Sequence, residues 1–146
     1  MALAFLVKHN ARDSEPLANR FYIYRTTPQS LTNRRRISNI AAEGNWIYVV
    51  ETVNSNPVVY RLGYKFLSTF SERHPTGGKW EDKYCCRNIS STPAEGQYFE
   101  DPILITDKDL HAFVRTKQGM VNIPAEYAAL FDAIFNANTS KSRKYA

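Results

Sequence analysis

Three consecutive arginines, Arg34, Arg35 and Arg36, lead into two segments that are rich in aromatic residues. Guanidinium groups bind phosphate through paired hydrogen bonds, and aromatic rings stack on the bases of nucleic acids. In residues 46–50 and 58–66 the aromatic side chains recur at alternate positions, which is the spacing of residues on one face of a β-strand. The pattern therefore predicts strands that hold flat rings beside a basic rim able to bind an anion.

Two sets of side chains are candidates for contacts with a nucleic acid. The first set carries positive charge and is expected to bind phosphate: Arg34, Arg35, Arg36, Arg61 and Lys79. The second set is expected to form a pocket for a base, and it comprises Trp46, Tyr48, Tyr64, Trp80 and Tyr84 as stacking rings, with Ser38, Asn39 and Asn45 as readers of the base edge. Phosphate contacts position the nucleic acid, whereas base contacts provide specificity.

The same residues also allow structural interpretations. The arginine triplet fits a solvated loop, and Trp80 and Tyr84 fit a role in packing the loop-rich segment 71–97 onto the core. A further alternative is a protein-interaction module whose aromatic platform binds a peptide. The residues taken alone leave these alternatives open.

Catalysis by this chain is the less favoured alternative. His74, Glu81, Asp82 and Cys85 fall in one segment, and a Cys/His or His/carboxylate pair performs nucleophilic or general acid–base chemistry in many enzymes. Their spacing matches no catalytic motif, the histidines and cysteines lack the spacing of zinc ligands, and the sequence has no glycine-rich phosphate loop. We therefore expect no enzymatic activity, no metal site and no cofactor.

Composition limits the class of protein. The chain has 146 residues, a net charge of +5 and a sequence pI near 9.3, which fit one domain with a polyanionic partner. The two cysteines, Cys85 and Cys86, are adjacent, so a disulfide between them would be strained. No apolar run approaches the roughly 20 residues of a membrane span. We expect a soluble cytoplasmic protein that does not enter a membrane.

Local patterns predict an α+β fold whose strands precede its helices. Strands are expected over residues 4–8, 20–26, 46–50 and 58–66, with one face of the last two buried and the other facing out. The polar and basic segment 138–146 is expected to be a flexible tail or a linker.

Two helices are expected near the C-terminus. Thr106 is a predicted N-cap of a helix that stops by Gly119, and Pro124 suits the first turn of the next helix. The second helix has an apolar stripe that is typical of packing on one side, formed by Tyr127, Leu130, Phe131, Ile134 and Phe135.

Short motifs across most of the chain resemble EVE domains and the wider PUA-like superfamily. Residues Phe5–Lys8 resemble the first strand of EVE domains, and Gly44–Tyr48 resemble the Gly-Asp-hydrophobic step before a central strand, with Asn45 where aspartate is commoner. Residues 99–103, and 118–124 with the helix that follows, resemble the closing part of these modules. The resemblance implies a PUA-like, bent, mostly antiparallel β-barrel with flanking helices over residues 1–137.

The resemblance also implies a function. Such modules hold a modified base, flipped out of DNA, in an aromatic-walled pocket, and some are fused to nucleases in modification-dependent restriction systems. We therefore expect binding to methylated or hydroxymethylated DNA, with any nuclease activity in a fused or partner domain. An RNA-binding PUA-like protein and a peptide-binding module are the alternatives.

Overall fold

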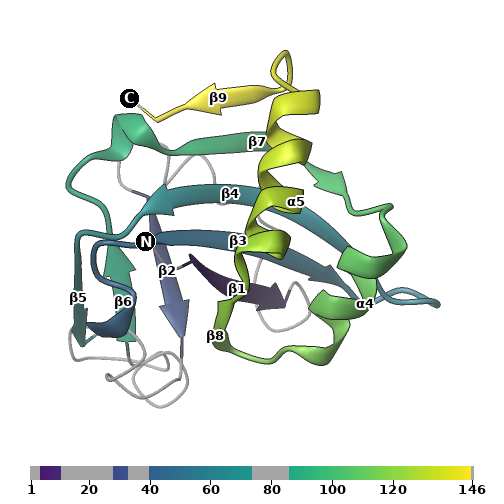
Figure 1. Ribbon diagram of the computed structural model, residues 1–146, viewed down its shortest axis with the longest axis horizontal. Helices are drawn as coiled ribbons and strands as arrows, with labels where there is room; N and C mark the ends of the chain where they lie inside the picture. The colour runs from purple at the N-terminus through teal and green to yellow at the C-terminus, as the bar shows by residue number, and fades with distance from the viewer. Residues whose placement is uncertain (1–3, 11–27, 33–39, 74–85, 146) are drawn as a thin grey trace.

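The computed structural model describes residues 4–10, 28–32, 40–73 and 86–145, which form an α+β arrangement of two sheets and two helices (Figure 1). The larger sheet has six strands in the order β8-β1-β3-β4-β7-β9. These strands are β1 Ala4–Asn10, β3 Trp46–Val53, β4 Val59–Leu67, β7 Gln97–Leu104, β8 Met120–Ile123 and β9 Ser142–Lys144. Of its neighbouring strand pairs, β1 and β3 are parallel and the others are antiparallel, so the mostly antiparallel α+β fold is confirmed.

The smaller sheet has three strands in the order β2-β6-β5. They are β2 Gln29–Thr32, β5 Phe70–Arg73 and β6 Cys86–Ile89. The predicted closure into a barrel is wrong for the described strands, because β8 and β9 end the larger sheet without pairing with each other. The strand expected over residues 20–26 lies outside the described residues.

Two helices, α4 Lys108–Thr116 and α5 Ala125–Ala137, pack on one face of the larger sheet (Figure 1). Phe131 and Phe135 of α5 are buried, and the Phe135 ring stacks on Phe99 of β7 with centroids 4.7 Å apart. The remaining members of the predicted apolar stripe, Tyr127, Leu130 and Ile134, are partly buried against the same cluster. The periodicity of this helix was therefore sufficient to predict its packing face.

The cap of α4 differs from the prediction by one residue. Asp107 is the N-cap, and its Oδ1 accepts a hydrogen bond from the backbone N–H of Leu110 at 2.8 Å. A carboxylate satisfies a free amide at the positive end of a helix, which explains why Asp107 takes this position in place of Thr106. No helix in the described part of the chain is long and apolar enough to cross a membrane.

Both faces of the central strands are buried, contrary to the prediction that one face is exposed. Tyr48 and Val50 of β3 belong to the cluster under the helices, whereas Ile47 and Val49 belong to a second cluster on the other face. The second cluster also contains Tyr145, near the C-terminus. Apolar residues at consecutive positions of a central strand are typical of burial on both faces, because other residues of the chain pack on each face.

The C-terminal residues form a strand where a flexible tail was predicted. Strand β9 pairs with β7, and Tyr145 after it is only 3% exposed, with its ring 5.0 Å from that of Tyr98. Gly96 allows this close packing, since a Cβ there would lie 3.0 Å from the Tyr145 ring and 2.8 Å from the carbonyl oxygen of Lys65. The segment predicted to be loop-rich, 71–97, likewise contains β6 and a short 3₁₀ helix, η1 Pro93–Glu95.

Candidate nucleic-acid interface

The predicted contact residues divide into those that the structure describes and those that it does not. Asn45, Trp46, Tyr48, Arg61 and Tyr64 are described. The others lie outside the described residues: Arg34, Arg35, Arg36, Ser38, Asn39, Lys79, Trp80 and Tyr84.

Tyr48 joins the sheet to α5. Its ring stacks on Phe131 with centroids 5.2 Å apart, and its hydroxyl donates a hydrogen bond to Oδ1 of Asp132 at 2.7 Å. Burial, and then the neighbouring carboxylate of Asp132, raise the pKa of the Tyr48 phenol far above its ordinary value. The side chain is 3% exposed, so its ring is occupied by contacts within the core.

Tyr64 lies in the other cluster, on the opposite face of the sheet from Tyr48. It is 3% exposed, and its ring stacks on Phe66 at 6.0 Å. The structure therefore does not bring Tyr48 and Tyr64 into one pocket. Alternating aromatic residues predict that side chains share a face, but they do not show whether that face is covered.

Trp46 is half-buried and forms part of a group of rings around the ammonium of Lys65. The Nζ atom of Lys65 lies 5.3 Å from the Trp46 ring centroid, 4.9 Å from that of Phe135 and 6.0 Å from that of Tyr48. The same Nζ is 2.9 Å from Oδ1 of Asp132. Cation–π attraction and the ion pair thus hold Lys65 between β3 and α5.

Sequence reasoning missed this lysine. The available signal was Asp132, a carboxylate beside Phe131 and three residues before Phe135 on the packing side of a helix. An acidic group beside the packing face of a helix is favourably placed to pair with a cation or a hydrogen-bond donor from the sheet below it. Lys65 and Tyr48, which are opposite each other in the register of β3 and β4, supply both.

Arg61 is paired within the sheet. It lies opposite Glu51, and one of its terminal nitrogens is 2.7 Å from Oε1 of that residue. Glu51 is fully buried, so the guanidinium compensates a charge that would otherwise be costly to bury. The charge of Arg61 is consequently less available to a phosphate than its sequence position indicates.

Asn45 holds the turn before β3. Its Nδ2 donates to the carbonyl oxygens of Ala41 at 3.1 Å and Glu43 at 3.3 Å, and its own carbonyl accepts the N–H of Ser68 at 3.0 Å. Gly44 in this turn has φ +80°, a conformation that glycine adopts without strain. The contacts of Asn45 give it a structural role at this turn.

The register of the smaller sheet brings together the ends of two undescribed segments. Thr32 at the end of β2 pairs with Cys86 at the start of β6, and Arg73 at the end of β5 pairs with the same Cys86. In the sequence, segment 33–39 follows Thr32 and segment 74–85 connects Arg73 to Cys86. We call this end of the smaller sheet, defined by Thr32, Arg73 and Cys86, the Cys86 end.

All the predicted contact residues that the structure does not describe fall in these two segments. Segment 33–39 contains Arg34–Arg36, Ser38 and Asn39, and segment 74–85 contains Lys79, Trp80 and Tyr84. Two stretches that are far apart in the sequence therefore start from one place in the fold. Within the described residues next to this end, Arg87 forms an ion pair with Glu72.

Comparisons of the chain with protein-family models, with curated proteins and with solved structures found no match.

Proposed function

We propose that the chain is a nucleic-acid-binding module that recognises a methylated or hydroxymethylated base in DNA, with its contact surface at the Cys86 end. The observation that carries the proposal is the register of β2, β5 and β6, which places Thr32, Arg73 and Cys86, the residues that flank the arginine and tryptophan segments, at one end of the smaller sheet. Arg34, Arg35 and Arg36 follow Thr32 within four residues. In the proposal these arginines act close to the Cys86 end, because consecutive Cα atoms are only about 3.8 Å apart.

Charge supports the same location. Taken together, segments 33–39 and 74–85 contain more Lys and Arg than Asp and Glu. In the proposal the arginine triplet and Lys79 bind phosphates, which makes binding depend on salt but not on sequence. Arg61 takes no part, because it is paired with Glu51.

Recognition of the base falls to Trp80 and Tyr84. Stacking on an aromatic ring contributes about 1–3 kcal/mol per base, and extruding a base from a duplex costs a few kcal/mol. Two rings and several phosphate contacts are therefore enough to offset extrusion. Tyr48 and Tyr64 contribute to the core, and Trp46 to the group around Lys65.

The finer fold assignment is part of the proposal. The motifs at residues 5–8, 44–48 and 99–103 resemble EVE domains, and we propose a PUA-like arrangement of these strands and helices. In this arrangement the chain is the specificity domain of a modification-dependent restriction system. Any nuclease would lie in a fused or partner domain.

The test is a fluorescence-anisotropy titration at two salt concentrations. The probes are duplexes of one sequence that carry cytosine, methylcytosine, hydroxymethylcytosine or methyladenine, together with an RNA of the same sequence. We expect tighter binding to one modified duplex by about ten-fold, equivalent to about 1.4 kcal/mol, with weaker binding at the higher salt concentration. Equal affinity for all duplexes would refute base recognition, a preference for the RNA would favour the RNA-binding alternative, and absence of binding would refute the whole proposal.

A further inference from the structure

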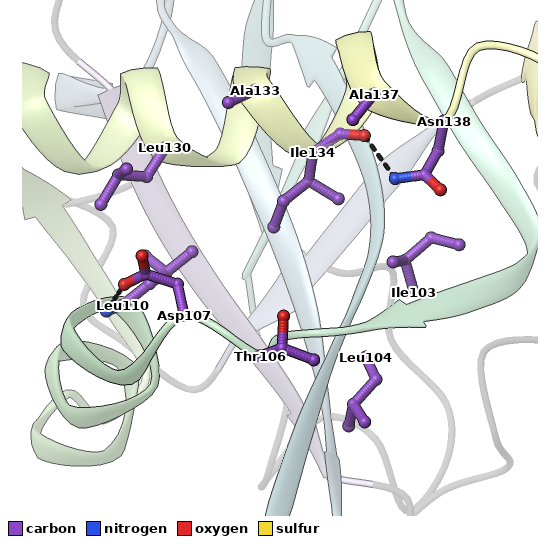
Figure 2. Close-up of a pocket in the computed structure, with 10 residues that line it drawn as sticks. All are labelled: Ile103, Leu104, Thr106, Asp107, Leu110, Leu130, Ala133, Ile134, Ala137 and Asn138. Carbon is purple, nitrogen blue, oxygen red and sulfur yellow. Dashed lines mark hydrogen bonds between the residues drawn. The ribbon is translucent and has the colours of Figure 1, made fainter.

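A groove that the proposed function does not use lies between α4, α5 and the end of β7. Its first hollow has a volume of about 300 Å³ and is lined mainly by apolar side chains, among them Ile103, Leu110, Leu130 and Ile134 (Figure 2). Leu104 also lines this hollow and is 48% exposed, which is unusual for a large aliphatic side chain. Exposed apolar side chains that gather in a hollow are typical of a binding surface.

A second hollow, of about 580 Å³, continues the groove along α4 and α5. Its floor contains Phe113 and Tyr127, whose rings stack with centroids 3.7 Å apart. Leu130 lines both hollows, so they adjoin at this side chain. Together the two hollows offer successive places for apolar side chains of one ligand.

The charged residues that line the groove are all acidic. They are Asp107 in the first hollow and Asp109 and Glu126 in the second, and all three are exposed. Asp109 lies on the same face of α4 as Phe113, because residues four apart in a helix are neighbours. Lys108 and Arg115 of the same helix do not line either hollow, and Lys117 lies over the Phe113 ring at 4.8 Å.

We propose that this groove docks a basic, leucine-rich segment of a partner protein. Leucine side chains enter the two hollows, and lysine or arginine side chains between them meet the carboxylates of Asp107, Asp109 and Glu126. The sign of the lining charge favours a cationic peptide and disfavours nucleic acid, whose phosphates the carboxylates repel. The chain would then bind two partners of opposite charge on separate surfaces.

The test uses a short fluorescein-labelled peptide of leucine, alanine and lysine whose leucines have helical spacing, so that they share one face. Anisotropy should show saturable binding by the full chain. A peptide with glutamate in place of every lysine, and one with serine in place of every leucine, should bind at least about ten-fold more weakly, because each loses one of the two kinds of contact.

Variants locate the binding surface. Asp109→Asn with Glu126→Gln removes two acidic groups and should weaken binding of the lysine peptide roughly 2- to 30-fold, the range expected for two exposed ion pairs. Ala133→Trp fills the first hollow from an exposed position on α5 and should also weaken it. Asp101→Asn is a single-charge control, since Asp101 is exposed but lines neither hollow, and it should bind as the wild type does.

Circular dichroism establishes that each variant is folded before its binding is compared. Nuclear magnetic resonance of the labelled chain should place the peptide-induced shifts at Leu104, Phe113 and Leu130. Shifts confined to other surfaces, equal binding by the double variant and the Asp101→Asn control, or absence of binding would each overturn the proposal. Self-association of the chain that Ala133→Trp abolishes would also overturn it, because a second copy would then occupy the groove.

Discussion

Lys65 of β4 and Asp132 of α5 form an ion pair, 2.9 Å between Nζ and Oδ1, that joins the helix to the middle of the larger sheet. Tyr48 donates its hydroxyl to the same oxygen at 2.7 Å. The Lys65 side chain is 15% exposed, so its charge is largely removed from water and depends on Asp132 and the surrounding rings. The Lys65–Asp132 ion pair thus has a structural role, and it lies beside Trp46 and Tyr48, which were predicted from the sequence to line a base pocket.

Replacing Asp132 should destabilise the fold. Asp132→Ala leaves the Lys65 ammonium without its carboxylate and the Tyr48 hydroxyl without this acceptor, and we expect the free energy of unfolding to fall by about 1–3 kcal/mol. Urea denaturation measures the change. Asp101→Ala removes an exposed carboxylate elsewhere and should change stability by less than about 0.5 kcal/mol. Equal effects of the two substitutions would show that the Lys65 contact contributes little.

The phenol of Tyr48 should make stability fall at alkaline pH. Its pKa is raised in the folded chain, whereas an unfolded tyrosine ionises near its ordinary value of 10.0. Below about pH 10 the phenol is protonated in both states, so its full contribution to stability is present. Above that pH only the unfolded chain releases the proton, and the free energy of unfolding falls by up to about 1.4 kcal/mol per pH unit.

Tyr48→Phe isolates this effect. Burial raises the pKa of Tyr145 and lowers that of Lys8, and both groups remain in the variant, so the difference between the two proteins reports Tyr48. The variant should lose stability less steeply than the wild type when urea midpoints are compared between about pH 9 and pH 11. Parallel curves for the two proteins would contradict the raised pKa.

Tyr145 should stabilise the chain through its ring and not through its hydroxyl. The side chain is 3% exposed, and among the described residues its hydroxyl has no hydrogen-bond partner. Tyr145→Ala should lower the free energy of unfolding by about 3–5 kcal/mol, as expected for deletion of a buried aromatic side chain. Tyr145→Phe removes only an unpaired buried polar group and should be neutral or slightly stabilising. Thermal melts of both variants test this, and a small effect of Tyr145→Ala would indicate that residues 142–145 contribute little to the core.

The strands and the packing face of α5 could be predicted because they depend on local periodicity. Residues 4–8, 46–50 and 58–66 lie within β1, β3 and β4 apart from Val58, and Phe131 and Phe135 point into the core as their spacing indicates. The open sheet could not be predicted, since it depends on which strands at its edges pair over long sequence separations. Strand β9 is a case of this kind. Its polar residues carry little strand signal, and β7 supplies the pairing.

For the candidate site, residue types select candidate side chains but do not specify where the fold places them. Tyr48 and Tyr64 lie in strands, as their spacing predicts, but on opposite faces of the sheet. Both faces are covered, one of them by α5. Arg61 pairs with the buried Glu51. The two residues are ten positions apart in the sequence, on either side of a turn, and that spacing does not indicate that they form an ion pair. Segments 33–39 and 74–85 both adjoin the Cys86 end because of the register of β2, β5 and β6, which residue types do not specify.

The arginine triplet should account for much of the salt dependence of nucleic-acid binding. Arg34, Arg35 and Arg36 replaced together by glutamine should reduce the slope of log affinity against log salt concentration by about 2–3, since each phosphate contact contributes close to one. The matched control replaces three exposed residues, Lys141 just before β9 and Arg143 and Lys144 within it, and removes the same charge. That control should keep most of the wild-type slope. An equal reduction of the slope in both triple variants would show that net charge, and not a defined surface, determines the salt dependence.

The central claim, recognition of a modified base at the Cys86 end, is tested most directly by the affinity ratio of modified to plain duplex in two tryptophan variants. Trp80→Ala should lower this ratio by at least about five-fold, because one stacked base contributes about 1–3 kcal/mol. Trp46→Ala removes a ring that contacts Lys65 and should reduce stability while leaving the ratio unchanged. Anisotropy titrations of the wild type and both variants with the preferred duplex and its unmodified counterpart give the three ratios. The account predicts that the ratio of modified-duplex to plain-duplex affinity falls in Trp80→Ala and stays at the wild-type value in Trp46→Ala. An unchanged ratio in Trp80→Ala would contradict the account.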